Sequence, residues 1–225
     1  CYYAETLPNP KLNVFPIKEV ADIGRSLGVP LIMDNTAVPI SCRPIEHGAA
    51  VVVYSTTKYI GGHGTSIGGL IVDGGNFDWE AHADRFPLLN EPDPSYHGAV
   101  WTEAVKPLGP IAYILKARVT LLRDVGAAMS PQNAFQFIQG LETLPLRMER
   151  HCENAIKVTD YLQAHDKVER VIFPGQMEGV ARERADKYLN GGYGGLAGIV
   201  LKGGDDAGRK FIDSLEMLYH VANIG

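Results

Sequence analysis

Short apolar runs that end in polar residues are the feature that most constrains the fold of this chain. One run leads to Asp34, a second covers Ala50–Tyr54 and a third covers Gly69–Val72. Apolar runs of about four to eight residues bounded by turn formers are typical of buried strands. Because these runs do not alternate with polar residues, we expect helices to cover both faces of the sheet, as in parallel sheets. The pattern predicts an α/β fold with a largely parallel sheet.

An amphipathic helix is predicted over Ile17–Leu27, before the first of these strands. Its apolar residues recur at helical spacing, Pro16 precedes it and Gly28 ends it. Proline before the first turn and glycine after the last are common helix boundaries. The alternation of helix and strand supports the α/β assignment.

The middle of the chain is predicted to be helical. Ile111–Val125 has the helical period, and Ser130 followed by Pro131 is an N-cap and first-turn signal. Two helices, Gln132–Leu141 and Leu146–His165, are expected to follow. Before them, the stretch 73–107 is rich in turn formers and is predicted to be a long loop, which is more often functional or a partner contact than idle.

A second, smaller α+β domain is predicted to begin near Pro145. Strands are expected near Val168–Phe173, Leu196–Lys202 and Leu218–Val221. We therefore divide the chain into residues 1–144, a large-domain portion, and residues 145–225, a long linking helix with part of a C-terminal domain. Arg147, Glu149 and Arg150 alternate in sign along the linking helix and are interpreted as a solvated or inter-subunit face.

Lys58 is the best candidate for chemistry, because it follows one predicted strand while Asp34 follows another. In open α/β sheets the ligand crevice lies at the carboxyl ends of the strands, so the two side chains can share one ligand. Pyridoxal phosphate needs such a pair: a lysine amine for a Schiff base and a carboxylate for the pyridine nitrogen. Ser55 and Thr57 flank the lysine and offer hydroxyls to a phosphate.

Each of these residues also has a simpler interpretation. A lysine after a strand is usually solvated, and an aspartate there often caps the next segment or forms an Asx-turn. Ser55 and Thr57 could merely cap a helix. Together, these four residues favour a cofactor site more strongly than any one of them does alone.

Composition and spacing argue against several other classes of function. The glycine-rich segment 61–69 lacks the spacing of nucleotide P-loops and dinucleotide folds. A net charge of −5 with dispersed basic residues disfavours nucleic-acid binding. The seven histidines and three cysteines show neither metal-ligand spacing nor a disulfide framework, and a reducing cytoplasm is the expected compartment. No apolar run approaches the roughly 18 residues of a membrane span.

The residues around Lys58 resemble the Cys/Met-metabolism family of pyridoxal-phosphate enzymes. The likeness rests on the segments PLIMDNT and YSTTKYIGGH, and on ETLPNP near the start of the chain. It implies the large domain of fold-type I PLP transferases, with Lys58 as the catalytic lysine that binds the cofactor. It also implies that Asp34, Ser55, Thr57 and Asn9 bind pyridoxal 5′-phosphate.

Three later segments, EPDPSYHG, NAFQFIQGLETLPLRMERH and HVANIG, are most similar to the O-acetylhomoserine sulfhydrylase branch of that family. The resemblance implies γ-replacement on O-acetylhomoserine with sulfide to give homocysteine, a small amino-acid substrate, no metal, and a homodimer or homotetramer. The alternatives are cystathionine γ-synthase or methionine γ-lyase chemistry, because shared cofactor residues do not determine the nucleophile.

The resemblance also implies an internal fragment, because subunits of this family are roughly twice as long. The ring-stacking tyrosine and the arginine for the substrate carboxylate are expected outside these 225 residues, and Asn223 is expected to reach the edge of the substrate site. A hypothesis of a different class follows: the chain is a non-catalytic piece that needs complementing segments.

Overall fold

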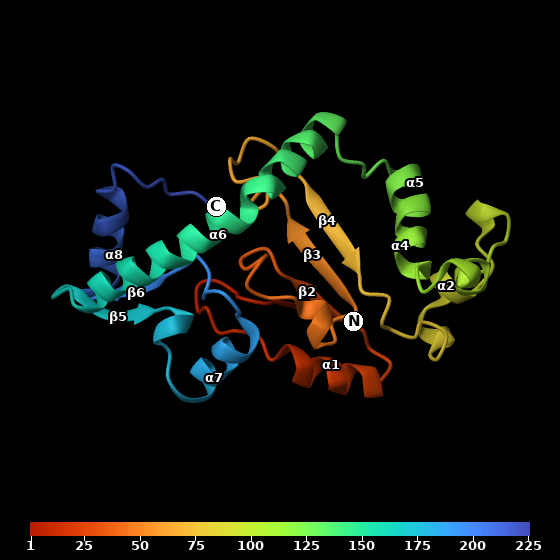
Figure 1. Ribbon diagram of the computed structural model, residues 1–225, viewed down its shortest axis with the longest axis horizontal. Helices are drawn as coiled ribbons and strands as arrows, with labels where there is room; N and C mark the ends of the chain where they lie inside the picture. The colour runs from red at the N-terminus through yellow and green to blue at the C-terminus, as the bar shows by residue number, and fades with distance from the viewer.

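A four-stranded sheet forms the centre of the computed structural model, which describes residues 1–225 (Figure 1). Its strands are β1 (Tyr2–Glu5), β2 (Leu31–Asp34), β3 (Val51–Ser55) and β4 (Gly69–Asp73), and they lie in that order. The pairs β1–β2 and β2–β3 are parallel, and β3–β4 is antiparallel. The predicted α/β fold with a largely parallel sheet is confirmed.

The helix α1 (Ile17–Ser26) connects β1 to β2 and lies where the sequence predicted it. Ile17 and Ala21 are buried on its inner face, against a core that includes Leu31 and Met33 of β2. Gly28 has a φ of +66°, a left-handed conformation that glycine adopts without steric cost, and this residue turns the chain into β2.

The expectation that all predicted strands are buried on both faces is wrong for β4. Gly69, Leu70 and Ile71 are exposed, and the strand runs against the direction of its neighbour. A short run such as GLIV does not predict strand direction, because apolar strands occur in mixed sheets as well as in parallel sheets.

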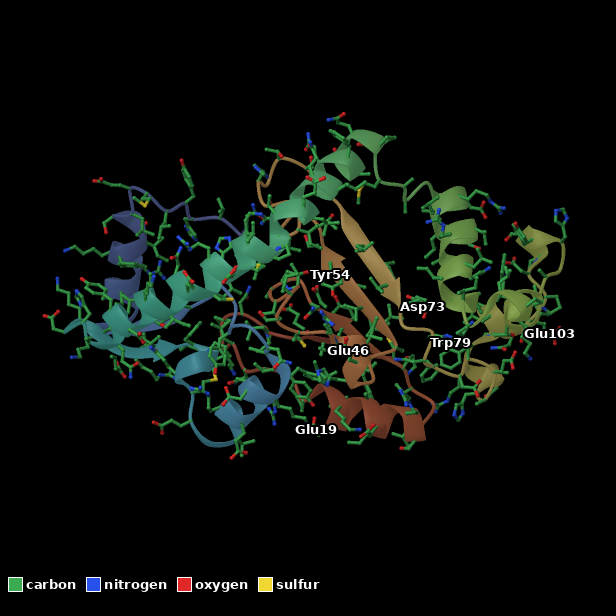
Figure 2. The ribbon with its side chains drawn as sticks, in the orientation of Figure 1. Glu19, Glu46, Tyr54, Asp73, Trp79 and Glu103 are labelled. Atoms are coloured by element: carbon green, nitrogen blue, oxygen red, sulfur yellow. The ribbon has the colours of Figure 1, made fainter.

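The stretch 73–107, predicted to be a long loop, is more ordered than expected, because it holds the short helices α2 (Pro87–Asn90) and α3 (Trp101–Ala104). The helix predicted over Ile111–Val125 is confirmed, as α4 (Ala112–Lys116), a π-helical turn (Ala117–Leu122) and α5 (Arg123–Val125). Further 3₁₀ turns, η2 to η4, lie at Ala83–Arg85, Pro94–Tyr96 and Lys106–Leu108. This part has its own small core around Trp79, which lies apart from the sheet in Figure 2.

The two helices predicted after Ser130 are one 33-residue helix, α6 (Pro131–Gln163). The predicted cap is present, since the Ser130 hydroxyl accepts the N–H of Asn133 at 3.1 Å. Pro145 lies inside the helix although it cannot donate the usual backbone hydrogen bond. Burial of Leu144 and Met148 on either side of it holds the helix on the body of the protein.

The last 60 residues form a smaller layer in which β5 (Val168–Ile172) pairs antiparallel with β6 (Gly198–Leu201). Two helices, α7 (Gly179–Tyr188) and α8 (Gly204–Asp213), complete it, with the 3₁₀ turn η6 at Pro174–Gln176 before α7. The strand predicted at Leu218–Val221 is wrong: this segment is irregular and exposed. Strands need a hydrogen-bonded neighbour, and none is paired with it.

The helix α7 packs against α1 across the main core. The Tyr188 hydroxyl accepts the backbone N–H of Lys18 at 2.9 Å and donates to Glu19 at 2.6 Å. Tyr188 and Leu189 belong to the same buried cluster as Leu31 and Met33. The contact between α1 and α7 therefore joins residues on both sides of the domain boundary predicted at Pro145. Pro145 itself lies within α6. None of the helices is both long enough and apolar enough to cross a membrane.

Candidate functional site

A cavity of about 320 Å³ lies at the carboxyl ends of β1, β2 and β3. It brings together five of the six predicted site residues, Asn9, Asp34, Ser55, Lys58 and Asn223. Its remaining lining residues are Glu5, Leu7, Thr36, Ala37, Leu196, Val221, Ala222 and Ile224. Parallel strands deliver their last residues to one edge of the sheet, and that topology explains why Asp34, Ser55 and Lys58 meet here. Asn223 comes from the irregular segment after α8.

Asp34 is the last residue of β2, and one of its carboxylate oxygens accepts two hydrogen bonds. Oδ1 accepts the backbone N–H of Thr36 at 3.0 Å and the Thr36 hydroxyl at 2.6 Å. Oδ2 has only a long contact from the Tyr3 hydroxyl, at 3.4 Å. Burial, and then the Asp34 charge, raise the pKa of Tyr3. One oxygen therefore orients the carboxylate while the other retains capacity to accept a proton or a hydrogen bond.

Thr36 joins the two strands that carry the predicted site. Its hydroxyl donates to Asp34 and accepts the backbone N–H of Ser55 at 2.8 Å. The sequence pattern places Thr36 in the DNT segment but indicates no role for it. The available signal was its place two residues after a strand-ending aspartate, where a hydroxyl can bond to a neighbouring side chain or backbone group.

Lys58 reaches across the cavity to the far end of the chain. Its Nζ donates to the Ala222 carbonyl and to Asn223 Oδ1, both at 2.8 Å. Asn223 was expected at the edge of the substrate site, and here it contacts the lysine amine itself. Asn9 is exposed at the rim of the cavity.

The backbone on either side of Lys58 forms a tight turn over residues 55–62. The Lys58 N–H donates to the Ser55 carbonyl, and the Lys58 carbonyl accepts the N–H of Gly62 at 2.8 Å. Tyr59 is buried beneath this turn, and burial raises its pKa to about 12. We call residues 55–62 the lysine turn.

Thr57 lies in the lysine turn but not in the cavity. Its hydroxyl accepts the N–H of Gly68 at 3.1 Å, and it lines a neighbouring hollow with His63 and Gln136. His63 Nδ1 lies 2.9 Å from the Gly61 carbonyl, so this ring is held by its own loop. The predicted contact of Thr57 with a cofactor stays a prediction.

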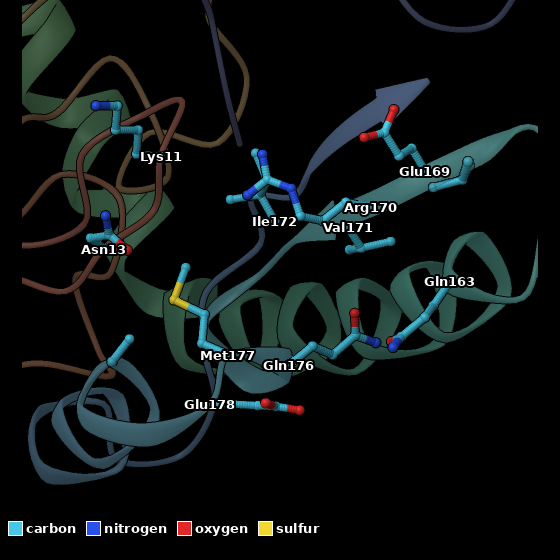
Figure 3. A pocket seen from close by; sticks show the side chains of 12 residues that line it. Lys11, Asn13, Gln163, Glu169, Arg170, Val171, Ile172, Gln176, Met177 and Glu178 are labelled. Carbon is cyan, nitrogen blue, oxygen red and sulfur yellow. The ribbon is translucent and has the colours of Figure 1, made fainter. Parts of the chain in front are cut away.

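A larger hollow of about 630 Å³ lies away from these residues, between α7, β5 and the end of α6 (Figure 3). Its lining mixes both charges, with Lys11 and Arg170 on the basic side and Glu169 and Glu178 on the acidic side. None of the predicted site residues lines it. No group of three or more histidine, cysteine, aspartate or glutamate side chains is arranged to hold a metal ion.

Solved structures with this architecture include a putative O-acetylhomoserine (thiol)-lyase from Campylobacter jejuni. It is 33% identical with a TM-score of 0.88, over 98% of this chain and 54% of that one, and it carries a pyridoxyl-lysine phosphate. A cystathionine γ-synthase from Xanthomonas oryzae is 28% identical with a TM-score of 0.74, over 99% of this chain and 48% of that one.

Curated relatives match the chain along its length. An O-acetyl-L-homoserine sulfhydrylase from Leptospira meyeri is 50% identical, over 100% of this chain and 52% of the relative. A homocysteine synthase from Schizosaccharomyces pombe is 46% identical, over 99% of this chain and 52% of the relative. The chain thus spans about half the length of these relatives. The family model for Cys/Met metabolism PLP-dependent enzymes matches residues 1–225, and the chain belongs to that family.

Proposed function

We propose that the protein bearing this chain is a PLP-dependent transferase that replaces the acetate of O-acetylhomoserine with sulfide to give homocysteine. The observation that carries the proposal is the meeting of Lys58 and Asp34 in one cavity at the strand ends. The relatives favour the sulfhydrylase reaction over the alternatives, because the most similar ones named above are a sulfhydrylase and a homocysteine synthase.

The residues of the cavity fit pyridoxal phosphate by their chemistry. Lys58 supplies a primary amine, and Asp34 supplies a carboxylate whose Oδ2 has only one long contact. Ser55 adds a hydroxyl on the Lys58 side and Asn9 adds an amide at the rim. When bound, the cofactor supplies an electron sink for negative charge that develops on the substrate.

Three residues of that cavity would act on the cofactor or the substrate. Asp34 would hold a proton on the pyridine nitrogen, because a carboxylate stabilises the protonated form of a neighbouring base. The Lys58 amine would bind the cofactor and then remove and return protons at Cα and Cβ of the substrate. Asn223 would hold the freed amine through the contact it makes at 2.8 Å. The carbon–oxygen bond at Cγ breaks to release acetate, and sulfide forms the new carbon–sulfur bond.

We further propose that the protein is a homo-oligomer, a dimer or a tetramer, located in the cytoplasm. Large apolar side chains are exposed along the first half of α6, including Phe135, Ile138 and Leu146. Exposed apolar stretches of this kind often mark subunit contacts. The three cysteines are all unpaired, which suits a reducing compartment. Light scattering on the purified protein tests the oligomeric state.

The reaction is tested by incubating the protein with pyridoxal phosphate, O-acetylhomoserine and sulfide, and measuring homocysteine. Parallel reactions replace sulfide with cysteine, to detect cystathionine synthesis, or omit the nucleophile, to detect elimination. Homocysteine as the main product supports the sulfhydrylase. Faster formation of cystathionine or of an oxoacid would move the protein to the γ-synthase or γ-lyase class.

A further inference from the structure

Arg147 on α6 is the one member of its charged segment that does not belong to a solvated face. The alternating charges of 147–150 indicate a solvated or inter-subunit face, and the solvated interpretation is wrong for Arg147. Its side chain is half-buried and turns toward the lysine turn, whereas the Arg150 side chain is 73% exposed and pairs with Glu153 on the same helix.

The Arg147 guanidinium binds the backbone just after Lys58. One terminal nitrogen donates to the Tyr59 carbonyl at 2.7 Å, and the other donates to the Ile60 carbonyl at 3.2 Å. The second nitrogen also donates to the Gly140 carbonyl at 2.8 Å, and Nε donates to the Thr143 hydroxyl at 3.1 Å. No backbone N–H bonds to the carbonyls of Tyr59 or Ile60, so Arg147 satisfies two acceptors that the turn leaves open.

No carboxylate is paired with Arg147, although arginines that are removed from water are usually paired with an acid. Burial lowers the pKa of Arg147, and burial followed by the Arg147 charge lowers the pKa of His151 one turn further along. A planar fork with several donors suits adjacent carbonyls in a way that a single ammonium does not.

Two glycines show how closely the helix and the lysine turn fit. A side chain at Gly140 would collide with the Ile60 carbonyl, so only glycine lets α6 approach the turn this far. Gly62 has a φ of +73°, and a Cβ there would lie 2.6 Å from an Arg147 nitrogen. The turn, the helix and the guanidinium therefore form one tightly fitted unit.

We propose that Arg147 is a positioning residue for the reaction assigned above: by holding the Tyr59 and Ile60 carbonyls it fixes the backbone from which Lys58 reaches the cofactor. This inference rests on the proposed role of Lys58. Arg147 lies outside the cavity and does not touch the reacting atoms. It acts through the direction of the Lys58 side chain, and small errors in such a direction cost large factors in rate.

The test compares Arg147→Met and Arg147→Lys with Arg150→Met, a control that removes the same charge from an exposed site on the same helix. The first measurement is hydrogen exchange without cofactor. Arg147→Met should speed exchange in peptides covering 55–64 by roughly tenfold, the factor expected for a lost charge-assisted hydrogen bond, and leave β5 and β6 unchanged. Arg150→Met should leave both regions unchanged.

The second measurement is the rate at which Lys58 is labelled by pyridoxal phosphate and borohydride between pH 6 and 9, read by peptide mass spectrometry. Arg147→Met should label about tenfold more slowly and with an altered pH profile. Arg147→Lys should recover part of the rate, because a single ammonium can reach one carbonyl but not both. Should Arg147→Met not fold, Arg147→Lys alone still tests the inference.

Wild-type labelling rates and pH profile in Arg147→Met would overturn the positioning role, as would unchanged exchange over 55–64. The labelling is done on the protein bearing this chain, and failure of that unaltered protein to label Lys58 is a different result. It would refute the proposed function, and with it the positioning role, whatever the exchange data show for the backbone contact.

Discussion

The Thr36 hydroxyl donates a 2.6 Å hydrogen bond to the Asp34 carboxylate and accepts the backbone N–H of Ser55 at 2.8 Å. Through Thr36 the end of β2 and the end of β3 are joined by a side chain as well as by the sheet. The distance between the proposed cofactor residues on the two strands therefore depends on a residue that itself lines the same cavity.

Replacing Thr36 with valine should destabilise the protein, because Asp34 loses a donor and the Ser55 N–H loses its acceptor while the shape stays similar. We expect a loss of about 1–3 kcal/mol in the free energy of unfolding, the range for leaving a partly buried polar group unpaired. Urea unfolding followed by circular dichroism measures it. Thr36→Ser keeps the hydroxyl and should remain near wild type; equal stability of the serine and valine variants would contradict the bridging role.

Replacing Lys58 with alanine should abolish the borohydride-reducible adduct with pyridoxal phosphate, because no other amine lines the cavity. Peptide mass spectrometry locates the label. Lys106→Ala is the matched control, since the Lys106 amine pairs with Glu80 at 2.8 Å outside the cavity. A specific label that persists on another lysine in the Lys58→Ala variant would show that the assignment is wrong.

The Asp34→Asn variant tests whether the negative charge of Asp34 contributes to turnover, because asparagine has nearly the same shape. An asparagine can still accept the Thr36 hydrogen bonds but carries no charge to hold a proton on the pyridine nitrogen. Loss of one preorganised electrostatic partner typically costs ~3 kcal/mol of transition-state stabilisation, so turnover should fall roughly a hundredfold. Asp22→Asn, which alters an exposed pair with Lys18, is the control. Normal turnover of Asp34→Asn would rule out the electron-sink role of this carboxylate.

Acid should weaken the contact between α1 and α7. Hydrogen bonds from Lys187 and then Tyr188 lower the pKa of Glu19 to about 2 from its ordinary 4.5. A lowered pKa in the folded state means that the stabilisation is complete above pH 4.5 and is lost as the pH falls toward 2.

The effect should be modest, because the Glu19 and Lys187 side chains are 54% and 43% exposed and water screens their charges. Urea midpoints measured between pH 6 and pH 2.5 should converge for wild type and Glu19→Gln as the pH falls. A constant difference across that range would show that Glu19 acts by packing rather than by charge.

The 225-residue chain alone should bind pyridoxal phosphate weakly and form little homocysteine. No aromatic ring lines the cavity to stack on the cofactor, and no arginine lines it to clamp a substrate carboxylate. A bidentate arginine supplies both affinity and orientation, so its absence lowers binding and rate together. Absorbance titration with the cofactor and a homocysteine assay check this. Robust turnover by the chain alone would contradict it and would also exclude a non-catalytic fragment.

Local sequence was enough to predict the elements that form the proposed site. The strand ending at Asp34 and the strand before Lys58 were predicted from apolar runs, and α1 was predicted from period and caps. The meeting of Lys58 and Asp34 was predicted from the rule that the carboxyl ends of parallel strands lie at the same edge of a sheet. The strand β1 and the helices α7 and α8 were not predicted: β1 has only four residues, α7 has a weak apolar pattern, and α8 begins in the turn-like segment Gly203–Asp206.

The sequence by itself determined which residues could carry the chemistry, because residue type and position at a strand end are local properties. Only the tertiary structure decided the direction of β4, the continuity of α6 through Pro145, and the partners of Lys58 and Arg147. Asn223 is 165 residues from Lys58, and Arg147 is 88 residues from Tyr59. Periodicity and caps describe neighbours along the chain, whereas these hydrogen bonds exist only after packing has brought distant segments within bonding distance.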